Sequence, residues 1–367
     1  MSKNNKLMEH KIFCFVRQNL NYGGASKIML WLYNSLRRNN IDVYILTLEN
    51  NKTNTHIIDP ERLISLNYKS SSNYLKRNIV GFYDKYVIIS KFLQDKKVTD
   101  IINFGDSLFD YLLLYKYFHK VNLIISERVD PYYNRNIISK IRRSFFSYAD
   151  KIVFQTCGAR DYYPERIRNK SIVIPNPVII NKVVPIWTGI NSQEIVYIGR
   201  LDNYQKRLDL LVDSFSIVHK QYGNYILCIY GDGPDKDWLE NYIKERGLES
   251  CIKLKGVTNC TYDIISTSKM LILTSDFEGI PNILIEALQV GIPIVSTDCS
   301  PGGARLLISD SENGYIVERG NVIAISERIM NLLNNTNLQC YISQNALKSI
   351  DRFKESSIVE MWLNYLM

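Results

Sequence analysis

The sequence of 367 residues is poor in the residue patterns that bind metals or close disulfides. Its four histidines, at positions 10, 56, 119 and 219, lack the spacing of metal ligands. Its seven cysteines are scattered, and no two of them form a C-x-x-C pair. These absences argue against a structural zinc site and against a disulfide framework, and they favour a reducing compartment such as the cytosol.

Long apolar runs are missing as well. No stretch approaches the roughly 18 consecutive apolar residues of a membrane-spanning helix. Residues 12–16 (IFCFV) are too short for the apolar region of a signal peptide, and we expect them to form a first strand. The apolar fraction of 46% and the charged fraction of 22% are typical of globular chains, and the length predicts two domains of similar size.

Charge is distributed unevenly along the chain. The 45 Lys and Arg exceed the 37 Asp and Glu, giving a net charge of +8. Residues 1–185 hold 29 basic against 15 acidic residues, a net charge of +14, which leaves 16 against 22, or −6, for the remainder. No nucleic-acid-binding module is recognisable, so we expect no nucleic-acid partner. An anionic membrane surface is the favoured partner of the basic half.

Two segments of the first half mix basic with aromatic and aliphatic residues. They are 74–97 (YLKRNIVGFYDKYVIISKFLQDKK) and 136–151 (NIISKIRRSFFSYADK). Such helices suit an interfacial docking face, although each segment alone also fits an ordinary amphipathic helix packed on its own sheet. Together with the charge asymmetry, the two segments favour docking on a membrane.

Short apolar strands alternate with helical stretches in both halves. This order predicts an α/β protein with parallel sheets covered by helices on both faces. Residues 175–193 contain three prolines and have no periodicity, so we interpret them as the linker between two domains. Two such domains, facing each other with the carboxyl edges of their sheets, would leave a ligand cleft between them.

Residues 274–303 (TSDFEGIPNILIEALQVGIPIVSTDCSPGG) carry the clearest candidate site. After an apolar strand and a polar turn, Pro281 is expected in the first turn of a helix, which Gly291 ends. The N–H groups at the start of that helix suit a phosphate. Glu278 and Glu286, eight residues apart, could bind hydroxyl groups on either side of the phosphate. The pattern predicts a nucleotide-sugar site.

The second half resembles the donor-binding domain of glycosyltransferase family 4, which has the GT-B fold. Four pieces match in the order of the family: 198–215 (IGRLDNYQKRLDLLVDSF), 231–240 (GDGPDKDWLE), 255–257 (KGV) and 278–288 (EGIPNILIEAL), the last with the E-x7-E pattern. In the first half, 20–32 (LNYGGASKIMLWL) resembles the Gly-Gly helix start of the family. Residues 125–131 (ISERVDP) and 296–305 (STDCSPGGAR) resemble a bacterial subgroup that builds surface polysaccharides or lipid-linked oligosaccharides.

The resemblance implies two Rossmann-like domains and assigns them roles. Residues 1–183 would form an acceptor-binding and membrane-docking domain, and 184–353 the nucleotide-sugar-binding domain. The tail, about 354–367, resembles the helix that crosses back to the N-terminal domain in this fold.

The resemblance also implies roles for single positions. Arg200 and Lys206 would hold the donor diphosphate, because cations neutralise the charge that grows on a nucleoside diphosphate leaving group. Glu278 would accept hydrogen bonds from the donor sugar, and Glu286 from the ribose. Further donor contacts are implied at Gly24, Gly199, Val257, Gly279, Ile280, Asn282 and Leu284.

One departure from the family concerns the chemistry. Many relatives carry a histidine near the donor where this chain has Arg128, and a guanidinium can bind hydroxyls or phosphate but does not act as a general base. A second departure is Ser26-Lys27, where many relatives have Glu-Arg. The family is retaining, with the leaving phosphate thought to deprotonate the acceptor. We therefore expect substrate-assisted chemistry among four catalytic candidates: Glu278, Arg200, Lys206 and Arg128.

Other polar residues have two interpretations. Glu127, Arg128 and Asp130 follow a buried strand, so they are candidates for binding the acceptor, although an ion pair that holds the turn at Pro131 would explain them nearly as well. Asp235-Lys236-Asp237 resembles a metal-binding D-x-D, but after Gly-Pro we interpret Asp235 as a helix N-cap. We expect no metal and no cofactor, since the family's usual fold needs none.

The sequence therefore predicts a retaining, metal-independent hexosyltransferase. It would move a sugar of the Gal, GalNAc, Glc or GlcNAc type from a UDP-sugar to a lipid-linked saccharide during bacterial surface polysaccharide assembly. We expect it to be cytoplasmic and peripheral at the inner face of the plasma membrane. The alternatives are a UDP-sugar epimerase of the same architecture and a non-catalytic nucleotide-sugar-binding subunit.

Overall fold

The computed structural model describes residues 11–20, 24–49, 58–66, 81–105, 108–133, 137–178 and 184–367. The chain divides into two compact units, residues 1–176 with 356–367, and residues 177–355. The sequence placed this boundary after residue 183. Several predicted features lie wholly or partly outside the described residues: Gly23, His10, His56, and segments 74–80 and 179–183.

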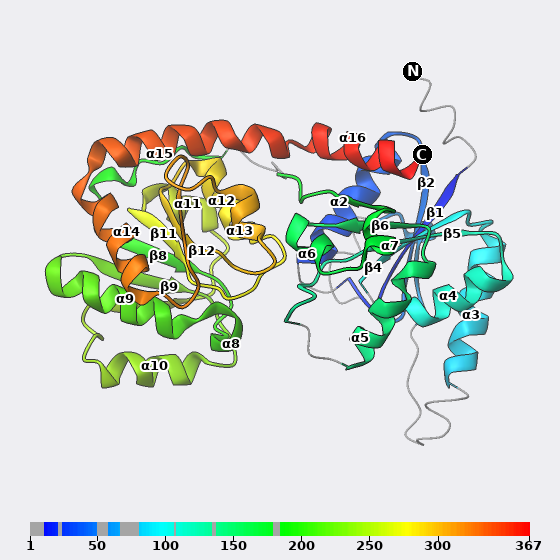
Figure 1. Cartoon of the computed structure of the whole chain (residues 1–367), viewed down its shortest axis with the longest axis horizontal. Coiled ribbons are helices and arrows are strands. Elements are labelled where there is room, and N and C mark those ends of the chain that lie inside the picture. The colour runs from blue at the N-terminus through cyan, green and yellow to red at the C-terminus, as the bar shows by residue number, and fades with distance from the viewer. Residues whose placement is uncertain are drawn as a thin grey trace. The chain divides into compact units, whose positions relative to one another are not determined.

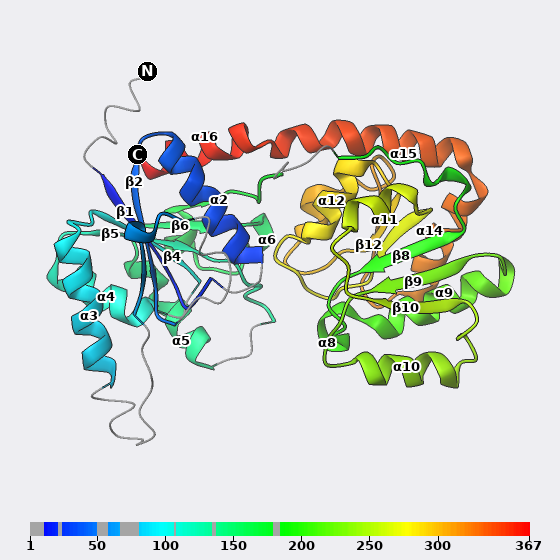
Figure 2. The ribbon, with the colours of Figure 1, turned by 180° about the vertical axis from the view of Figure 1, so that it is seen from behind.

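The first unit contains a parallel sheet whose seven described strands follow the order β3-β2-β1-β4-β5-β6-β7. Its strands are β1 (Ile12–Arg17), β2 (Asp42–Thr47), β3 (Leu63–Ser65), β4 (Asp100–Phe104), β5 (Asn122–Ser126), β6 (Lys151–Phe154) and β7 (Ser171–Val173). Its helices are α2 (Gly24–Arg38), α3 (Gly81–Asp95), α4 (Phe109–Phe118), α5 (Ile137–Ser144), α6 (Cys157–Asp161), α7 (Glu165–Arg168) and α16 (Glu355–Leu366). Figure 1 and Figure 2 show helices flanking this sheet.

The C-terminal helix α16 packs in the first unit. Its Trp362 is fully buried. The hydroxyl of Tyr365 donates to the carbonyl oxygen of Lys170 over 2.6 Å and accepts the N–H of Ile152 over 3.0 Å. These contacts attach the end of the chain to strand β6 and the residue before β7.

The second unit contains a parallel sheet whose six strands follow the order β10-β9-β8-β11-β12-β13. Its strands are β8 (Glu194–Ile198), β9 (Ile226–Tyr230), β10 (Ile252–Gly256), β11 (Met270–Leu273), β12 (Ile294–Thr297) and β13 (Tyr315–Val317). Its helices are α8 (Asn203–Lys206), α9 (Leu208–Gln221), α10 (Lys236–Glu245), α11 (Thr261–Thr267), α12 (Asn282–Val290), α13 (Gly303–Leu307), α14 (Val322–Asn334) and α15 (Thr336–Ser349). In Figure 1, α11, α12 and α15 lie on one side of the sheet and α9 and α10 on the other.

The central strands of both sheets are buried on both faces. All five residues of β4 and all four residues of β11 are buried. Only parallel strands covered by helices on two sides bury such continuous runs. The prediction of two parallel-sheet α/β domains is therefore confirmed. Among the described residues, every helix is too short or too polar to cross a membrane.

Candidate active site

Four strands of the second sheet end in turns at one edge. Gly199 follows β8, Gly231 follows β9, β10 ends at Gly256, and Thr274 follows β11. All four strands run parallel, so these turns meet at the carboxyl edge of the sheet. Open α/β sheets bind their ligands at this edge.

Two glycines let neighbouring turns of this edge pack backbone against backbone. A Cβ atom on Gly231 would lie 1.8 Å from the carbonyl oxygen of Gly199, and one on Gly233 would lie 2.3 Å from that of Leu201. Any side chain at either position would push the turns apart. Arg200 lies in the turn that these glycines fix.

Lys206 and Glu278 form an ion pair at this edge, although 72 residues separate them. Glu278 also accepts hydrogen bonds from the Ser275 hydroxyl over 3.0 Å and from the Gln205 side-chain amide over 3.3 Å. The side chains of Lys206 and Glu278 are only 14% and 12% exposed. The structure thus brings together two residues of the predicted nucleotide-sugar site. It also surrounds the Glu278 carboxylate with groups that donate hydrogen bonds.

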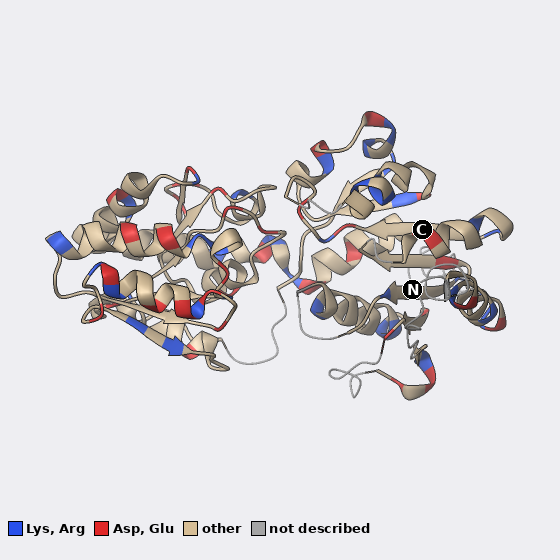
Figure 3. Ribbon diagram, turned by 90° about the horizontal axis from the view of Figure 1, so that it is seen from below, with Lys and Arg blue, Asp and Glu red and all other residues tan. Residues whose placement is uncertain are grey.

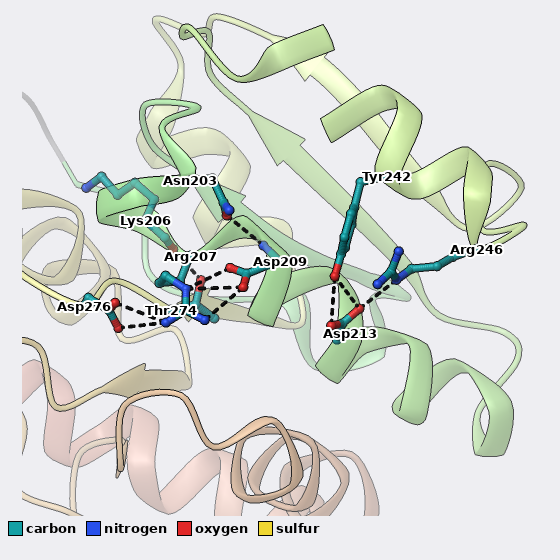
Figure 4. A network of polar contacts seen from close by, with 9 residues as sticks. All are labelled: Asn203, Lys206, Arg207, Asp209, Asp213, Tyr242, Arg246, Thr274 and Asp276. Atoms are coloured by element: carbon teal, nitrogen blue, oxygen red, sulfur yellow. Dashed lines mark hydrogen bonds and ion pairs between the residues drawn. The ribbon is translucent and has the colours of Figure 1, made fainter. Parts of the chain in front are cut away.

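Arg207 holds Lys206 in place from the next position of the chain. It adopts the left-handed conformation between α8 and α9, with φ 50° and ψ 55°. Its guanidinium donates to Asp209 over 2.9 Å and to Asp276 over 3.1 Å, and these hydrogen bonds raise the pKa of Arg207. The hydroxyl of Thr274 donates to the Lys206 carbonyl oxygen over 2.8 Å (Figure 4). The turn after β11 is thereby fixed to α8.

Arg200 is far more accessible than Lys206. Its side chain is 64% exposed, and its ion pair with Asp202 is long, at 3.9 Å. The hydroxyl of the buried Tyr197 donates to its carbonyl oxygen over 3.1 Å. The backbone of Arg200 is therefore fixed while its guanidinium can reach an anion.

The N-terminus of α12 offers backbone donors beside Glu278. Pro281 is the residue before this helix, which begins at Asn282, so the prediction of Pro281 in the first turn is wrong by one position. Among the described residues, no protein acceptor pairs with the N–H groups of Gly279 and Ile280. Two unpaired N–H groups next to a helix N-terminus suit a phosphate or a hydroxyl oxygen.

Leu284, for which the resemblance implied a donor contact, lies in the first turn of α12. Its side chain is fully buried in the core of the second unit, and its N–H donates to the Pro281 carbonyl oxygen over 3.0 Å. The helix thus already uses both the side chain and the N–H of this residue. The side chain of Leu284 thus packs α12 on the core, and its contact with the donor remains a prediction.

Glu286 lies in α12, and Val257 follows β10 at the same edge. Burial and, after it, the negative charge of Glu286 raise the pKa of Tyr262, a residue of α11, to about 12. Val257, the residue after β10, is 74% exposed. Their contacts with ribose and base remain predictions.

Asp235 is the N-cap residue of α10, as predicted, although its side chain does not cap the helix. It precedes α10, but its carboxylate accepts the N–H of Asn203 over 2.6 Å and makes no capping bond to α10. Asp235 therefore ties α8 to the turn after β9. The described residues contain no group of three or more His, Cys, Asp or Glu that could hold a metal ion.

In the first unit, Glu127 lies in a buried network rather than at the surface. Its carboxylate, like the Arg143 guanidinium that pairs with it over 3.3 Å, is almost inaccessible. The hydroxyl of Tyr163 donates to Glu127 over 3.2 Å. Burial, followed by the charge of Glu127, raises the pKa of Tyr163. The network attaches α5 to the end of β5.

Arg128 and Asp130 continue this loop. Asp130 is 3% exposed, and its carboxylate accepts the N–H of Tyr132 over 2.9 Å, which closes the turn at Pro131. Arg128 donates to the hydroxyl of Ser126 over 2.8 Å and to Asn176 over 3.1 Å. These geometries match the structural interpretation of Glu127 and Asp130, and acceptor binding by the three residues remains a prediction. Gly24, the fourth residue assigned to this half, begins α2.

The structure of α5 contradicts one part of the membrane-docking hypothesis, namely that the arginines of this helix are available to bind lipid headgroups. Arg143 is buried, and Arg142 pairs with Asp110 over 2.6 Å, so neither guanidinium is free for lipid headgroups. Figure 3 shows Lys and Arg spread over several elements of both units, among Asp and Glu. The exposed residues of α5 and of the short helix after it are mostly apolar: Ile137, Ile138, Ile141, Phe145 and Tyr148, beside Lys140 and Ser144.

The sequence did not predict the partners of Glu278 and Glu127 in their two ion-pair networks. Gln205 lies within the matched segment 198–215 and Ser275 lies just before the matched segment 278–288, so their positions were a usable signal, but nothing in the sequence indicates that both donate to Glu278. Arg143 was assigned to a membrane because a basic residue in an amphipathic segment resembles a surface residue. Only the fold reveals its partner, Glu127.

The chain belongs to the glycosyl transferases group 1 family. The family model matches residues 189–349, which include the Lys206–Glu278 edge. An uncharacterized glycosyltransferase of Methanocaldococcus jannaschii is 30% identical over 278 residues, covering 68% of this chain and 67% of that protein. The prediction of a glycosyltransferase is therefore confirmed.

Two further likenesses extend over nearly the whole chain. One is the Campylobacter jejuni GalNAc-α-(1→4)-GalNAc-α-(1→3)-diNAcBac-PP-undecaprenol α-1,4-N-acetyl-D-galactosaminyltransferase, 25% identical over 355 residues, covering 96% of this chain and 97% of that protein. The other is the crystal structure of Anabaena HepE in complex with UDP, at 16% identity and a TM-score of 0.79, covering 97% of this chain and 99% of that one. The second likeness supports the GT-B fold.

Proposed function

We propose that this protein is a retaining, metal-independent hexosyltransferase that moves a sugar from a UDP-sugar to a lipid-linked saccharide. The observation that carries the proposal is the Lys206–Glu278 pair at the carboxyl edge of the second sheet, with the exposed Arg200 on a neighbouring turn. This set combines cations for a diphosphate with a carboxylate for sugar hydroxyls.

The donor would be bound by residues of the second unit. Arg200 and Lys206 bind the diphosphate, and the N–H groups of Gly279 and Ile280 add neutral donors. Glu278 accepts hydrogen bonds from the sugar hydroxyls and keeps Lys206 oriented. The choice of UDP is supported by the bound UDP in the HepE structure, whose fold this chain shares.

We propose retention of the anomeric configuration, and the chemistry of the candidate residues supports this choice. Glu278 is paired with Lys206 and cannot act as a free nucleophile, and Arg128 stays protonated and is no base. The proton of the acceptor hydroxyl therefore passes to an oxygen of the leaving phosphate. The acceptor oxygen attacks the anomeric carbon from the same face of the sugar that UDP leaves, and the new bond forms as the bond to UDP breaks. Arg200 and Lys206 stabilise the negative charge that develops on the departing UDP.

The acceptor would be a saccharide on a lipid carrier, in the assembly of a bacterial surface glycan. The name of the Campylobacter jejuni relative, which describes transfer to a PP-undecaprenol saccharide, supports this choice. We propose that the exposed isoleucines of α5, beside the exposed Lys140, contact an anionic membrane, and that the enzyme is peripheral at the inner face of the plasma membrane.

Product analysis tests the proposal. The full chain is incubated with UDP-glucose, UDP-galactose, UDP-GlcNAc or UDP-GalNAc, with and without an extract of polyprenyl-linked saccharides. We expect UDP release and an extended saccharide only when donor and acceptor are both present. An epimerised nucleotide-sugar without acceptor identifies an epimerase instead, and binding of a donor with no product from any acceptor fraction identifies a binding subunit.

A further inference from the structure

Two arginines meet at the carboxyl edge of the first sheet. Arg17 is the last residue of β1, and Arg128 lies two residues after the end of β5. Strand β4, which ends at Phe104, runs between these two strands. Arg17 donates to the Phe104 carbonyl oxygen over 3.3 Å, and the Arg128 guanidinium lies 5.7 Å from the centre of the Phe104 ring. Both side chains therefore lie at the end of β4.

This place is the topological switch point of the sheet. From β1 the chain adds β2 and β3 on one side, and it then crosses to β4 on the other side of β1. Ligands of open α/β sheets bind outside the carboxyl ends of the strands at such a point. Helix α2 begins after β1 at the same edge, and its first N–H groups favour an anion there.

Neither guanidinium pairs with a carboxylate in the described part of the chain. Arg17 donates to the carbonyl oxygens of Asn19 and Phe104, and Arg128 donates to Ser126 and Asn176. The carboxylate next to Arg128 in sequence, that of Glu127, is directed to Arg143 and Tyr163. The Nη2 atom of Arg128 is buried and has no hydrogen-bond partner among the described residues.

Such an arrangement is unfavourable without a counter-ion. Burial and, after it, the positive charge of Arg17 lower the pKa of the Arg128 guanidinium to about 9, with Glu127 acting in the opposite direction. The Arg128 guanidinium lies over two aromatic rings, 5.7 Å from the centre of the Phe104 ring and 5.8 Å from that of the Trp362 ring. These cation–π contacts explain why Arg128 is held in place. They do not explain a second cation beside it. An anion that accepts from both arginines would offset the repulsion and satisfy the unpaired donor.

We propose that Arg17 and Arg128 bind a phosphate group of a substrate diphosphate at the switch point of the first unit. The guanidinium fork suits phosphate, and the two residues supply more donors than the protein itself uses. The choice of a diphosphate rests on the proposed function, since both the donor and the lipid-linked acceptor carry one. The anion site itself rests on the two arginines alone.

The first experiment titrates inorganic pyrophosphate into the full chain by calorimetry. The background variant combines Arg200→Gln with Lys206→Gln, so that the second unit no longer competes for the ion. We expect this variant to bind pyrophosphate, and Arg17→Gln or Arg128→Gln added to it to weaken binding at least about tenfold, as expected for loss of charge-assisted hydrogen bonds. Arg37→Gln is the matched control, because it removes the same charge from a surface pair with Asp42 in the same unit.

Arg17→Gln is the decisive variant, because among the described residues its half-buried side chain donates only to two backbone carbonyls. We expect its loss to leave the fold intact, which a thermal melt verifies. A background variant that binds no pyrophosphate overturns the proposal, and so does unchanged affinity in Arg17→Gln. This titration needs no turnover. An enzyme that transfers nothing but binds pyrophosphate through Arg17 refutes the proposed function and leaves the anion site standing.

A second experiment separates the two sources of the diphosphate in the otherwise native enzyme. If the donor supplies it, Arg17→Gln raises the Kd for UDP about tenfold and leaves the KM for the acceptor unchanged. If the acceptor supplies it, the Kd for UDP is unchanged, and the KM rises for a saccharide on a lipid diphosphate but not for the same saccharide on an uncharged aglycone. Both results support the site, whereas no change in any of these constants contradicts it.

Discussion

The carboxylate of Glu278 contacts the ammonium group of Lys206 and neutralises it within the second unit. The side chains of both residues are largely shielded from solvent, and Ser275 and Gln205 donate to the same carboxylate. Because Glu278 already orients the Lys206 ammonium group, Lys206 can also bind a phosphate without a rearrangement of its aliphatic side chain. The pair therefore forms a preorganised donor site.

Glu278→Gln separates the two roles of this carboxylate. The amide keeps the shape but removes the negative charge, so Lys206 keeps its full charge for a phosphate. We expect UDP to bind at least as tightly as in the wild type, and the transfer rate to fall about a hundredfold because sugar hydroxyls lose their anionic acceptor. Calorimetry with UDP and steady-state rates measure the two effects. Transfer at the wild-type rate would show that Glu278 does not contact the sugar.

Arg207→Ala tests whether the network in Figure 4 positions Lys206. The change leaves Asp209 and Asp276 without their shared partner, so we expect the free energy of unfolding to fall by about 1–3 kcal/mol and donor affinity to fall as well. Arg246→Ala is the matched control, because it breaks a comparable contact with Asp213. Urea unfolding and UDP titration measure both variants. Equal loss of UDP affinity in the two would contradict a positioning role.

Arg143→Leu tests the buried network of the first unit. The variant leaves Glu127 buried without its counter-ion, so we expect it to lower the free energy of unfolding by about 3–5 kcal/mol. The neighbouring Arg142→Leu removes only a partly exposed pair with Asp110 and should cost at most about 1 kcal/mol. Chemical denaturation compares the two. Similar small losses would mean that Arg143 is not enclosed as described.

Ile138→Ser combined with Ile141→Ser tests the docking face. These side chains are 58% and 55% exposed, and their burial in a lipid interface stabilises binding roughly in proportion to apolar area. We expect weaker flotation with vesicles containing anionic lipid and unchanged affinity for UDP. Ile323→Ser, at an equally exposed isoleucine of α14 in the second unit, is the control. Vesicle binding that remains at the wild-type level would exclude this face of α5.

The sheets were predictable because their physical signature is local. A strand such as β11 (MLIL) is an unbroken apolar run because both of its faces are covered, and polar or glycine turns mark where each strand ends. The strand order depends on pairings between distant segments, and apolar runs do not specify it. Even so, the alternation of strands and helices was enough to predict parallel sheets.

The candidate site was predictable only in part. Lys206 and Glu278 were identified through motifs that resemble a family, because no local pattern indicates that residues so far apart in the chain form a pair. Arg143 shows the limit most clearly. In the short helix α5, a basic residue, Arg143, lies on the buried face because it pairs with the buried carboxylate of Glu127. Helical periodicity alone would place such a residue on the exposed face. Leu284 is a similar case, since the motif does not indicate that its side chain is fully buried.

The central claim is that the carboxyl edge of the second unit binds the nucleotide-sugar donor. Titration of UDP-sugars into the wild type, Lys206→Ala and Lys220→Ala tests it most directly, since Lys220 lies at the opposite end of α9 from Lys206. We predict that at least one UDP-sugar binds the wild type and Lys220→Ala equally, and that its Kd rises about tenfold to a hundredfold in Lys206→Ala. Equal affinity in all three proteins would contradict the assignment of the donor site.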